Sequence, residues 1–384
     1  MHRERFSRLA RTLWNGWTLA LAGALASIPV ENAHAQDAAV AMLLAPVDGA
    51  VHAVVSDGAG GWFIGGRFRE VGGVPRHNLA HVLADRSVDL WNADTDGPVH
   101  ALQLSGGRLF VGGAFRLING QPRAHLAALD ARTATVELWD PHPNAPVMAI
   151  LPEGDVVYAA GCFTEIGDRA RGHLAALDAR SGVPTLWSPD ANGHVFTLAL
   201  DRGTLYAGGC FTEIGGRPRG HLAALSRESG RADLWDPQAD GPVLSIALSG
   251  SSVYAGGCFT RIGGGARGHL AQLDRTSGFA ELWNPDLDGA VMAVARSGNT
   301  VYAGGCFSRV GGQARGHATA IDARSGYAET WNPDANGPIA TLAVRDGAIV
   351  TGGSFSRLRD LDRARLAVTD RDFGFALERI PGVE

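Results

Sequence analysis

Residues 195–235 read VFTLALDRGTLYAGGCFTEIGGRPRGHLAALSRESGRADLW, and this stretch decides the fold because its pattern recurs along the chain. A tryptophan ends six copies at a constant spacing of 48 residues: Trp91, Trp139, Trp187, Trp235, Trp283 and Trp331. The phenylalanine of a Gly-Gly-x-Phe motif, which becomes Ala-Gly-x-Phe in the third copy, marks seven copies: Phe68, Phe115, Phe163, Phe211, Phe259, Phe307 and Phe355. A fixed period of this length is typical of proteins built from repeats, and seven units nearly fill the 384 residues.

Each unit contains four short runs with strand character. In the quoted copy these are residues 195–200, 204–211, 221–225 and 232–235, separated by turns that contain glycine. Short strands at regular spacing predict an all-β sandwich, barrel or propeller, and four strands with one aromatic marker per unit favour the propeller. We therefore predict that residues 36–384 form a seven-bladed β-propeller of four-stranded antiparallel blades, with the tryptophans packed between blades.

Both ends of the chain are predicted to share one blade. Counting by 48 residues from the tryptophans places Leu43 and Arg379 at equivalent positions, within residues 40–44 and 375–380. Both segments then compete for the outer strand of the same blade. We expect the N- and C-terminal segments to pair there and close the ring, because an open propeller would expose a strand edge.

The first 35 residues are predicted to be a signal peptide. Four arginines precede an apolar stretch at residues 17–30, and residues 33–35 (AHA) form a small-x-small cleavage site. The alternative is a retained membrane anchor, which would need about 20 apolar residues. We therefore expect a secreted or periplasmic protein, cleaved near Ala35, with no membrane span after signal removal.

Three motifs carry a resemblance to a known family: residues 331–337 (WNPDANG), 301–307 (VYAGGCF) and 173–178 (HLAALD). Along essentially its whole mature length, the sequence resembles the delta-60 repeat family of bacterial β-propellers. The resemblance implies a propeller fold and implies no enzymatic activity. The cysteine in the Gly-Gly-x-Phe motif and the histidine before Leu-Ala-Ala-Leu-Asp depart from the family pattern.

Polar loop residues are predicted to gather at one end of the propeller. In an antiparallel blade, the loop entering strand one and the loop joining strands two and three lie at the same end. The first loop is acidic, as at Asp334, and the second carries an arginine and a histidine. The candidate binding residues of this Arg/His/Asp face are Arg171, His173, Arg219, His221, Arg267, His269, Arg315 and His317. Rigid scaffolds present binding loops in this way, but repetition in every unit favours local Asp–Arg pairs between blades, worth under ~1 kcal/mol each.

The acidic turns and the cysteines give little support for metal binding. Asp286 and Asp288 precede a glycine as in calcium loops, but Asx residues also favour turns through hydrogen bonds to their own backbone. Four cysteines occupy one position in consecutive units, roughly 10 Å apart and beyond the ~7 Å limit for a disulfide. A Cys/His zinc site would have only two ligands per blade, where structural zinc needs four. We expect no metal, no cofactor and four buried free thiols: Cys162, Cys210, Cys258 and Cys306.

Composition and motifs favour binding over catalysis. The chain has 34 basic and 39 acidic residues and a net charge of −5, without the concentrated basic surface that nucleic-acid binding needs. It has no nucleophile elbow, His-Glu-x-x-His motif or phosphate loop, and we assign no catalytic residue. We predict an exported, non-catalytic, monomeric propeller that binds a protein or a glycan. The alternative is a hydrolase or quinoprotein-like enzyme at the central funnel, with a pocket that breaks the seven-fold pattern and shifted pKa values.

Overall fold

The structure is a computed structural model that describes residues 46–345, 347–359, 361–362 and 365–370. All regular elements in these residues are β-strands, arranged in seven three-stranded sheets and seven two-stranded hairpins. The predicted signal peptide and the two segments predicted to close the ring lie outside the described residues. Within the described ranges, we find no helix with the length and apolar character of a membrane span.

Each unit contributes one antiparallel sheet in which its second long strand is central. The sheets are β1 (Ala50–Ser56), β2 (Trp62–Arg67), β5 (Leu79–Val82); β6 (Val99–Ser105), β7 (Arg108–Gly113), β10 (Leu126–Asp130); β11 (Val147–Glu153), β12 (Val156–Gly161), β15 (Leu174–Asp178); β16 (Val195–Asp201), β17 (Thr204–Gly209), β20 (Leu222–Ser226); β21 (Val243–Ser249), β22 (Ser252–Gly257), β25 (Leu270–Asp274); β26 (Val291–Ser297), β27 (Thr300–Gly305), β30 (Ala318–Asp322); β31 (Ile339–Arg345), β32 (Ala348–Gly353), β35 (Leu366–Asp370).

A short hairpin follows the central strand of every sheet. Sequence alone assigned this stretch to a turn, residues 214–220 in the quoted copy. The hairpins are β3 (Glu70–Val71) with β4 (Val74–Pro75); β8 (Leu117–Ile118) with β9 (Gln121–Pro122); β13 (Glu165–Ile166) with β14 (Arg169–Ala170); β18 (Glu213–Ile214) with β19 (Arg217–Pro218); β23 (Arg261–Ile262) with β24 (Gly265–Ala266); β28 (Arg309–Val310) with β29 (Gln313–Ala314); β33 (Arg357–Leu358) with β34 (Leu361–Asp362).

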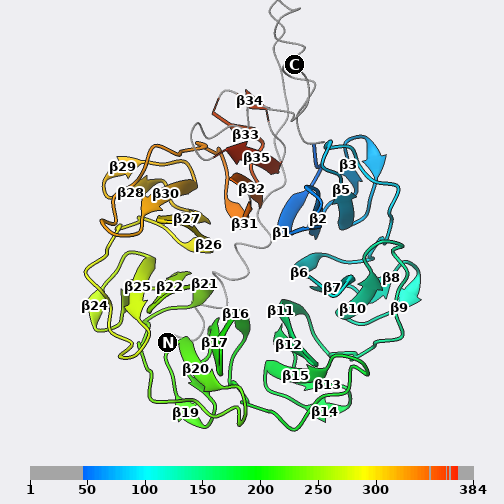
Figure 1. Cartoon of the computed structure of the whole chain (residues 1–384), viewed down its shortest axis with the longest axis horizontal. Helices are drawn as coiled ribbons and strands as arrows, with labels where there is room; N and C mark the ends of the chain where they lie inside the picture. The colour runs from blue at the N-terminus through cyan, green and yellow to red at the C-terminus, as the bar shows by residue number, and fades with distance from the viewer. Residues whose placement is uncertain (1–45, 346, 360, 363–364, 371–384) are drawn as a thin grey trace, which may run out of the picture. The chain divides into compact units, whose positions relative to one another are not determined.

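The first strands of the seven sheets form a closed cycle within the unit that spans Leu43–Glu384 (Figure 1). β1 contacts β6, each later first strand contacts the next, and β31 contacts β1. Arg345 Nη1 donates a hydrogen bond to Ser56 Oγ at 2.6 Å across this last junction. The last sheet therefore contacts the first sheet through residues that the structure describes. The segments predicted to pair, residues 40–44 and 375–380, are not among these residues.

The Gly-Gly-x-Phe motif allows neighbouring sheets to pack closely. A Cβ atom at Gly112 would lie 2.8 Å from Val147 Cγ1 of the next sheet, so a larger side chain would push β11 away. Gly352 stands in the same relation to Val51, at 2.7 Å, where the last sheet meets the first. The phenylalanine of the motif enters the core, and all seven are at most 3% exposed.

The tryptophans join each unit to the next one, as predicted. Trp283 is buried, and its indole packs edge-on against Tyr254 with ring centroids 5.4 Å apart. Its Nε1–H donates to the carbonyl oxygen of Asp322 in the following unit at 2.9 Å. Trp139, Trp187 and Trp235 make the equivalent hydrogen bond. These indoles therefore tie successive sheets together.

The predicted fourth strand is an irregular outer segment instead. In the quoted copy it pairs with the third strand through one isolated bridge, between Leu225 and Ala232. Asp233 N still donates to Ala224 O at 3.0 Å. The chain then leaves the ladder because Trp235 turns inward and reaches the next unit. We refer to the residues between the third-strand turn and each tryptophan as the outer segments.

Candidate functional site

The four arginines of the predicted binding face donate to the chain's own backbone. Arg171 Nη1 donates to Ala170 O at 2.7 Å, and Nη2 donates to Thr185 O at 2.6 Å. Each of the other three donates to the preceding carbonyl and to a carbonyl 14 residues further on: Arg219, Arg267 and Arg315. Each guanidinium thus ties the hairpin of its unit to the outer segment. This is a structural use of residues that we predicted to contact a ligand.

The four histidines of that face occupy a left-handed backbone position. Their φ angles lie between 62° and 65°: His173, His221, His269 and His317. The first unit has Asn78 at this position, with φ 65°. Asn, Asp and His are enriched in the left-handed region relative to other side chains. Burial lowers the pKa of His173, His221 and His317, so these three imidazoles are neutral at pH 7. His173, His221 and His317 therefore add little positive charge to the Arg/His/Asp face.

Replacing His269 with asparagine should change the free energy of unfolding by less than about 0.5 kcal/mol, because asparagine tolerates the left-handed region. Valine at this position should cost about 1–2 kcal/mol, because its branched Cβ crowds the backbone there. Urea unfolding of both variants measures the difference. Equal losses would show that the imidazole itself, rather than the backbone conformation, matters at this position.

The Asx residues of the acidic turns hold the neighbouring hairpins. Asp288 Oδ1 accepts hydrogen bonds from Ser308 N at 2.7 Å and from Arg309 N at 2.8 Å. Burial alone would raise the pKa of Asp288, but the hydrogen bonds from Ser308 and Arg309 outweigh it and hold the pKa below its usual range. Among the residues that the structure describes, no three His, Cys, Asp or Glu side chains come close enough to hold a metal ion.

All four cysteines are free, but they are less buried than predicted. Cys162 and Cys210 are half-buried, whereas Cys258 and Cys306 are exposed. Cys258 follows the end of β22 at Gly257 and is exposed there, whereas the next residue, Phe259, is buried. The surrounding protein nevertheless raises the pKa of each thiol, to about 11 for Cys162.

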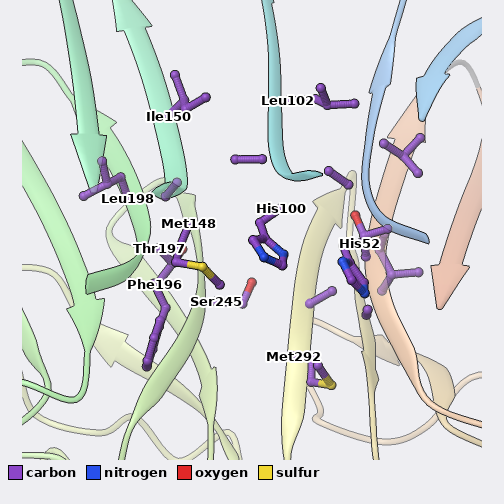
Figure 2. A pocket seen from close by; sticks show the side chains of 18 of the residues that line it. His52, His100, Leu102, Met148, Ile150, Phe196, Thr197, Leu198, Ser245 and Met292 are labelled. Atoms are coloured by element: carbon purple, nitrogen blue, oxygen red, sulfur yellow. The ribbon is translucent and has the colours of Figure 1, made fainter. Parts of the chain in front are cut away.

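A cavity of about 290 Å³ lies among the innermost strands, and all seven units contribute to its wall (Figure 2). The first strand of each unit has an irregularity in its ladder, such as the one between Val51 and Ala53. The residue at this bulge differs from unit to unit, in chain order: His52, His100, Met148, Phe196, Leu244, Met292 and Ala340. The seven-fold pattern therefore breaks at the wall of this cavity.

Two stacked histidines dominate one side of the cavity. The rings of His52 and His100 lie 5.3 Å apart between centroids and are nearly parallel, at 18°. Burial lowers the pKa of both, to about 4 for His100, and the Arg67 cation lowers that of His52 further. Both rings are neutral at pH 7. With Met148, Phe196 and Met292 they give the cavity an uncharged wall of polarizable side chains.

A second cavity, of about 370 Å³, lies beside residues 140–144. This segment departs from the repeat, and its His142 has φ 35°. Arg123, a counterpart of the arginines above, lines the cavity together with His125 and Asp140. His142 Nε2 lies 3.4 Å from Asp168 Oδ1. This is one place on the Arg/His/Asp face where a unit has its own geometry.

A family model described as outer membrane protein assembly factor BamB matches residues 78–326 and, in an overlapping match, residues 171–371. The chain belongs to this family. No curated protein gives a significant match. The propeller fold implied by the delta-60 resemblance is confirmed, whereas membership of that repeat family stays a prediction.

Solved structures similar to this BamB-family chain include a WD40 β-propeller domain, a protein complex and a designed protein. The crystal structure of the mitotic checkpoint complex matches with a TM-score of 0.60 and 14% identity, over 93% of this chain and 99% of that chain. The WD40 β-propeller domain of Doa1 matches at 0.59 and 11%, over 87% and 97%. The computationally designed Ika8 protein matches at 0.51 and 15%, over 86% and 100%. At these identities the likeness shows the fold alone, an all-β propeller.

Leucines point into solvent from the outer segments of this BamB-family propeller. They lie at one position in five consecutive units and are 83–100% exposed: Leu90, Leu138, Leu186, Leu234 and Leu282. Each precedes a buried tryptophan, so the alternation that turns the indole inward turns the leucine outward. A single exposed leucine is ordinary. Five at the same position have no packing role in the molecule, and we call them the rim leucines.

Proposed function

We propose that this protein is an exported, non-catalytic scaffold that binds other proteins, in keeping with a family described as outer membrane protein assembly factors. The rim leucines are the observation that carries the proposal. A set of exposed apolar side chains can form an interaction surface, and here a rigid frame repeats one at five equivalent positions. A glycan ligand would call for exposed polar groups instead, and the arginines that could supply them donate to the backbone.

Each three-stranded sheet with its outer segment would form one blade, which makes the scaffold seven-bladed and agrees with the delta-60 resemblance. The signal peptide at residues 1–35 would deliver it to the periplasm, where outer membrane proteins pass in an unfolded state. Their strands alternate apolar and polar residues in segments of about ten.

The outer segments offer a way to bind an extended chain. In the described residues they bridge to the third strand on one side, as Leu129 does to Val136 and Leu273 to Ala280. On the other side, Ala232 N and Ala280 N donate to Gly215 O and Gly263 O of the hairpins at 3.0 and 2.9 Å. An extended polypeptide can therefore bind through its apolar side chains, which contact the rim leucines. Several weak contacts around the rim would then act together through multivalency.

Replacing four rim leucines with serine should weaken binding of an unfolded outer membrane β-barrel protein by about tenfold or more. The positions are Leu138, Leu186, Leu234 and Leu282. The probe is a urea-unfolded β-barrel protein with a fluorescent label, diluted into the mature propeller and followed by anisotropy. Stability should change little, because exposed substitutions away from packed features stay within about 0.5 kcal/mol each.

The matched control replaces exposed arginines in the third-strand turns: Arg132, Arg180 and Arg324 to serine. This control should bind the probe as the parent protein does. Equal weakening in both variants would contradict a role for the rim leucines, as would full binding by the leucine variant.

The enzyme alternative has one observation in its favour, because the central cavity breaks the seven-fold pattern and holds histidines with lowered pKa values. A general base, however, works best with a pKa near the operating pH, and the pKa of His100 is about 4. Ser245, the serine in the cavity wall, accepts a hydrogen bond from Val294 N of the next unit at 2.9 Å. Its hydroxyl oxygen is therefore used to join two units. These features favour binding over hydrolysis at the cavity.

A further inference from the structure

One turn of the propeller lacks a carboxylate that the equivalent turns of other units supply. In the first unit, Asp94 Oδ1 accepts a hydrogen bond from His77 N at 2.7 Å. In the third unit, Asp190 Oδ1 accepts one from Gly172 N at 3.3 Å. These carboxylates hold the turn after the tryptophan to the loop that follows the hairpin. Aspartate occupies the same position in two later units: Asp286 and Asp334.

In the second unit this position holds a histidine. His142 keeps the left-handed backbone conformation of Asp190, with φ 35° against 45°. Its side chain is directed elsewhere, since Nδ1 lies 3.0 Å from Asp140 O. Ala124 is the counterpart of Gly172, and its N–H has no acceptor in the described ranges. The donor that a carboxylate satisfies in the third unit is therefore left open here.

The residue after His142 removes a second hydrogen bond. Ala191 N donates to Gly172 O at 3.0 Å in the third unit. Pro143 occupies the position of Ala191 and has no N–H. The turn at residues 140–144 is therefore not held to Ala124 by either hydrogen bond. The cavity of about 370 Å³ is lined by both this turn and Ala124.

The charge of the wall changes in the same unit. Arg116 lines the cavity and is exposed. In the described part of the chain it has no carboxylate within ion-pair distance. Asp140 also lines the cavity, but its Oδ2 lies 4.0 Å from Arg123 Nη1, so these two charges offset each other. Burial lowers the pKa of His125, which is neutral at pH 7. Arg116 therefore gives the wall a net positive charge. Five other units have a hydroxyl side chain at its position: Thr164, Thr212, Thr260, Ser308 and Ser356.

We propose that this cavity binds a small carboxylic acid in its ionised form, whose carboxylate takes the place of the missing aspartate side chain. One oxygen accepts the hydrogen bond from Ala124 N, and the Arg116 guanidinium pairs with the charge. Pro122 and Pro143 supply apolar walls for the body of the ligand. A cavity of this volume is in the range of small-molecule sites. The site is separate from protein binding at the rim leucines.

The cavity favours a carboxylate over a phosphate. The group that is missing from this turn is a planar carboxylate with a single negative charge, as the turns with Asp94 and Asp190 show. A phosphate dianion brings a second charge, for which the wall has no further unpaired cation. The Asp140 carboxylate in the same wall repels that second charge.

The test is a titration of the protein with sodium benzoate at pH 7, followed by calorimetry and by the amide signal of Ala124 in nuclear magnetic resonance. We expect saturable binding that shifts this signal. Benzamide has the same shape without the charge, and its affinity should be lower by about tenfold or more. Inorganic phosphate at the same concentration should not displace benzoate.

Two variants give the second unit the residues of its neighbours. H142D restores the carboxylate of Asp94 and Asp190, which takes the same donor, so benzoate binding should be lost. R116T removes the unpaired cation, and the affinity for benzoate should fall by about tenfold or more. Both new residue types already occur at the equivalent positions of other units. Thermal unfolding establishes that each variant is folded before titration.

The matched control is R69T, because Arg69 holds the position of Arg116 in the first unit, where Asp94 is in place. This variant should bind benzoate as the parent protein does. Equal losses in R69T and R116T would overturn the proposal in favour of general charge attraction. Undiminished binding by H142D, equal affinity for benzamide, displacement by phosphate, or no saturable binding by the parent protein would overturn it as well.

Discussion

Replacing Trp283 with alanine should lower the free energy of unfolding by about 3–5 kcal/mol. The indole is 4% exposed, packs edge-on against Tyr254 and donates to Asp322 O of the following unit. The substitution opens a cavity between two units and removes one of the hydrogen bonds that Asp322 O accepts, while the bond from Gly326 N at 2.9 Å stays. Guanidinium unfolding measures the loss, as a lower midpoint with an unchanged slope.

Leu282 provides the matched control because it is the preceding residue and is 100% exposed. Its replacement by alanine should change stability by less than about 0.5 kcal/mol. Trp283→Phe should lie between the two, since it keeps a ring against Tyr254 but loses the hydrogen bond. Similar losses at Leu282 and Trp283 would contradict the assignment of one side chain to the junction and the other to the rim.

Lowering the pH from 7 to 4 should destabilise the protein by several kcal/mol. Burial lowers the pKa of seven histidines in the folded state: His52, His100, His125, His173, His194, His221 and His317. The unfolded chain takes up protons near pH 6.5, where the folded protein does not, so protonation favours unfolding. Stability is therefore complete above pH 6.5 and falls as the pH approaches the folded-state values. His100 alone, with a pKa of about 4, accounts for on the order of 2–3 kcal/mol at pH 4.

The variant His100→Gln tests this assignment. It removes one titrating group from the cavity wall, so its stability should fall less steeply between pH 6.5 and pH 4 than that of the parent protein. Phe196→Leu changes the same cavity without a titrating group, and its pH dependence should match the parent's. Urea unfolding at a series of pH values gives both curves. If His100→Gln keeps the full slope, the histidine pair is not a source of the acid sensitivity.

The propeller framework could be predicted from the sequence because the residues that form it repeat in every unit. The seven phenylalanines and six tryptophans mark local hairpins and the contacts between adjacent units, which are the same in every copy. The two-residue hairpins were missed because they lie in a Gly-rich stretch with no alternation, such as residues 214–220. The outer segment was predicted to be a strand because apolar and polar residues alternate in it. The hydrogen-bonded ladder ends after Asp233, because Trp235 turns inward to reach the next unit.

Recurrence directed the candidate binding site to the Arg/His/Asp face, and ligand binding there stays a prediction. Arg171 and His173 were chosen as candidates because equivalent residues occur in several units. Their roles in the structure are local to each unit: the arginine joins the hairpin to the outer segment, and the histidine occupies a left-handed backbone position. The cavity wall lies at the bulge position, where His52, His100 and Met148 differ. The signal available in the sequence was a repeat position at which the residue type varies from unit to unit. Its position at the centre depends on seven strands that come together in space, which no local pattern reports.

Hydrogen exchange of the propeller bound to an unfolded outer membrane β-barrel protein tests the central claim most directly. The account predicts slower amide exchange in the outer segments beside the rim leucines, around residues 136–139, 184–187, 232–235 and 280–283, with the innermost strands unchanged. Protection confined to the central cavity or to the Arg/His/Asp face, with the outer segments exchanging as in the free protein, would contradict it.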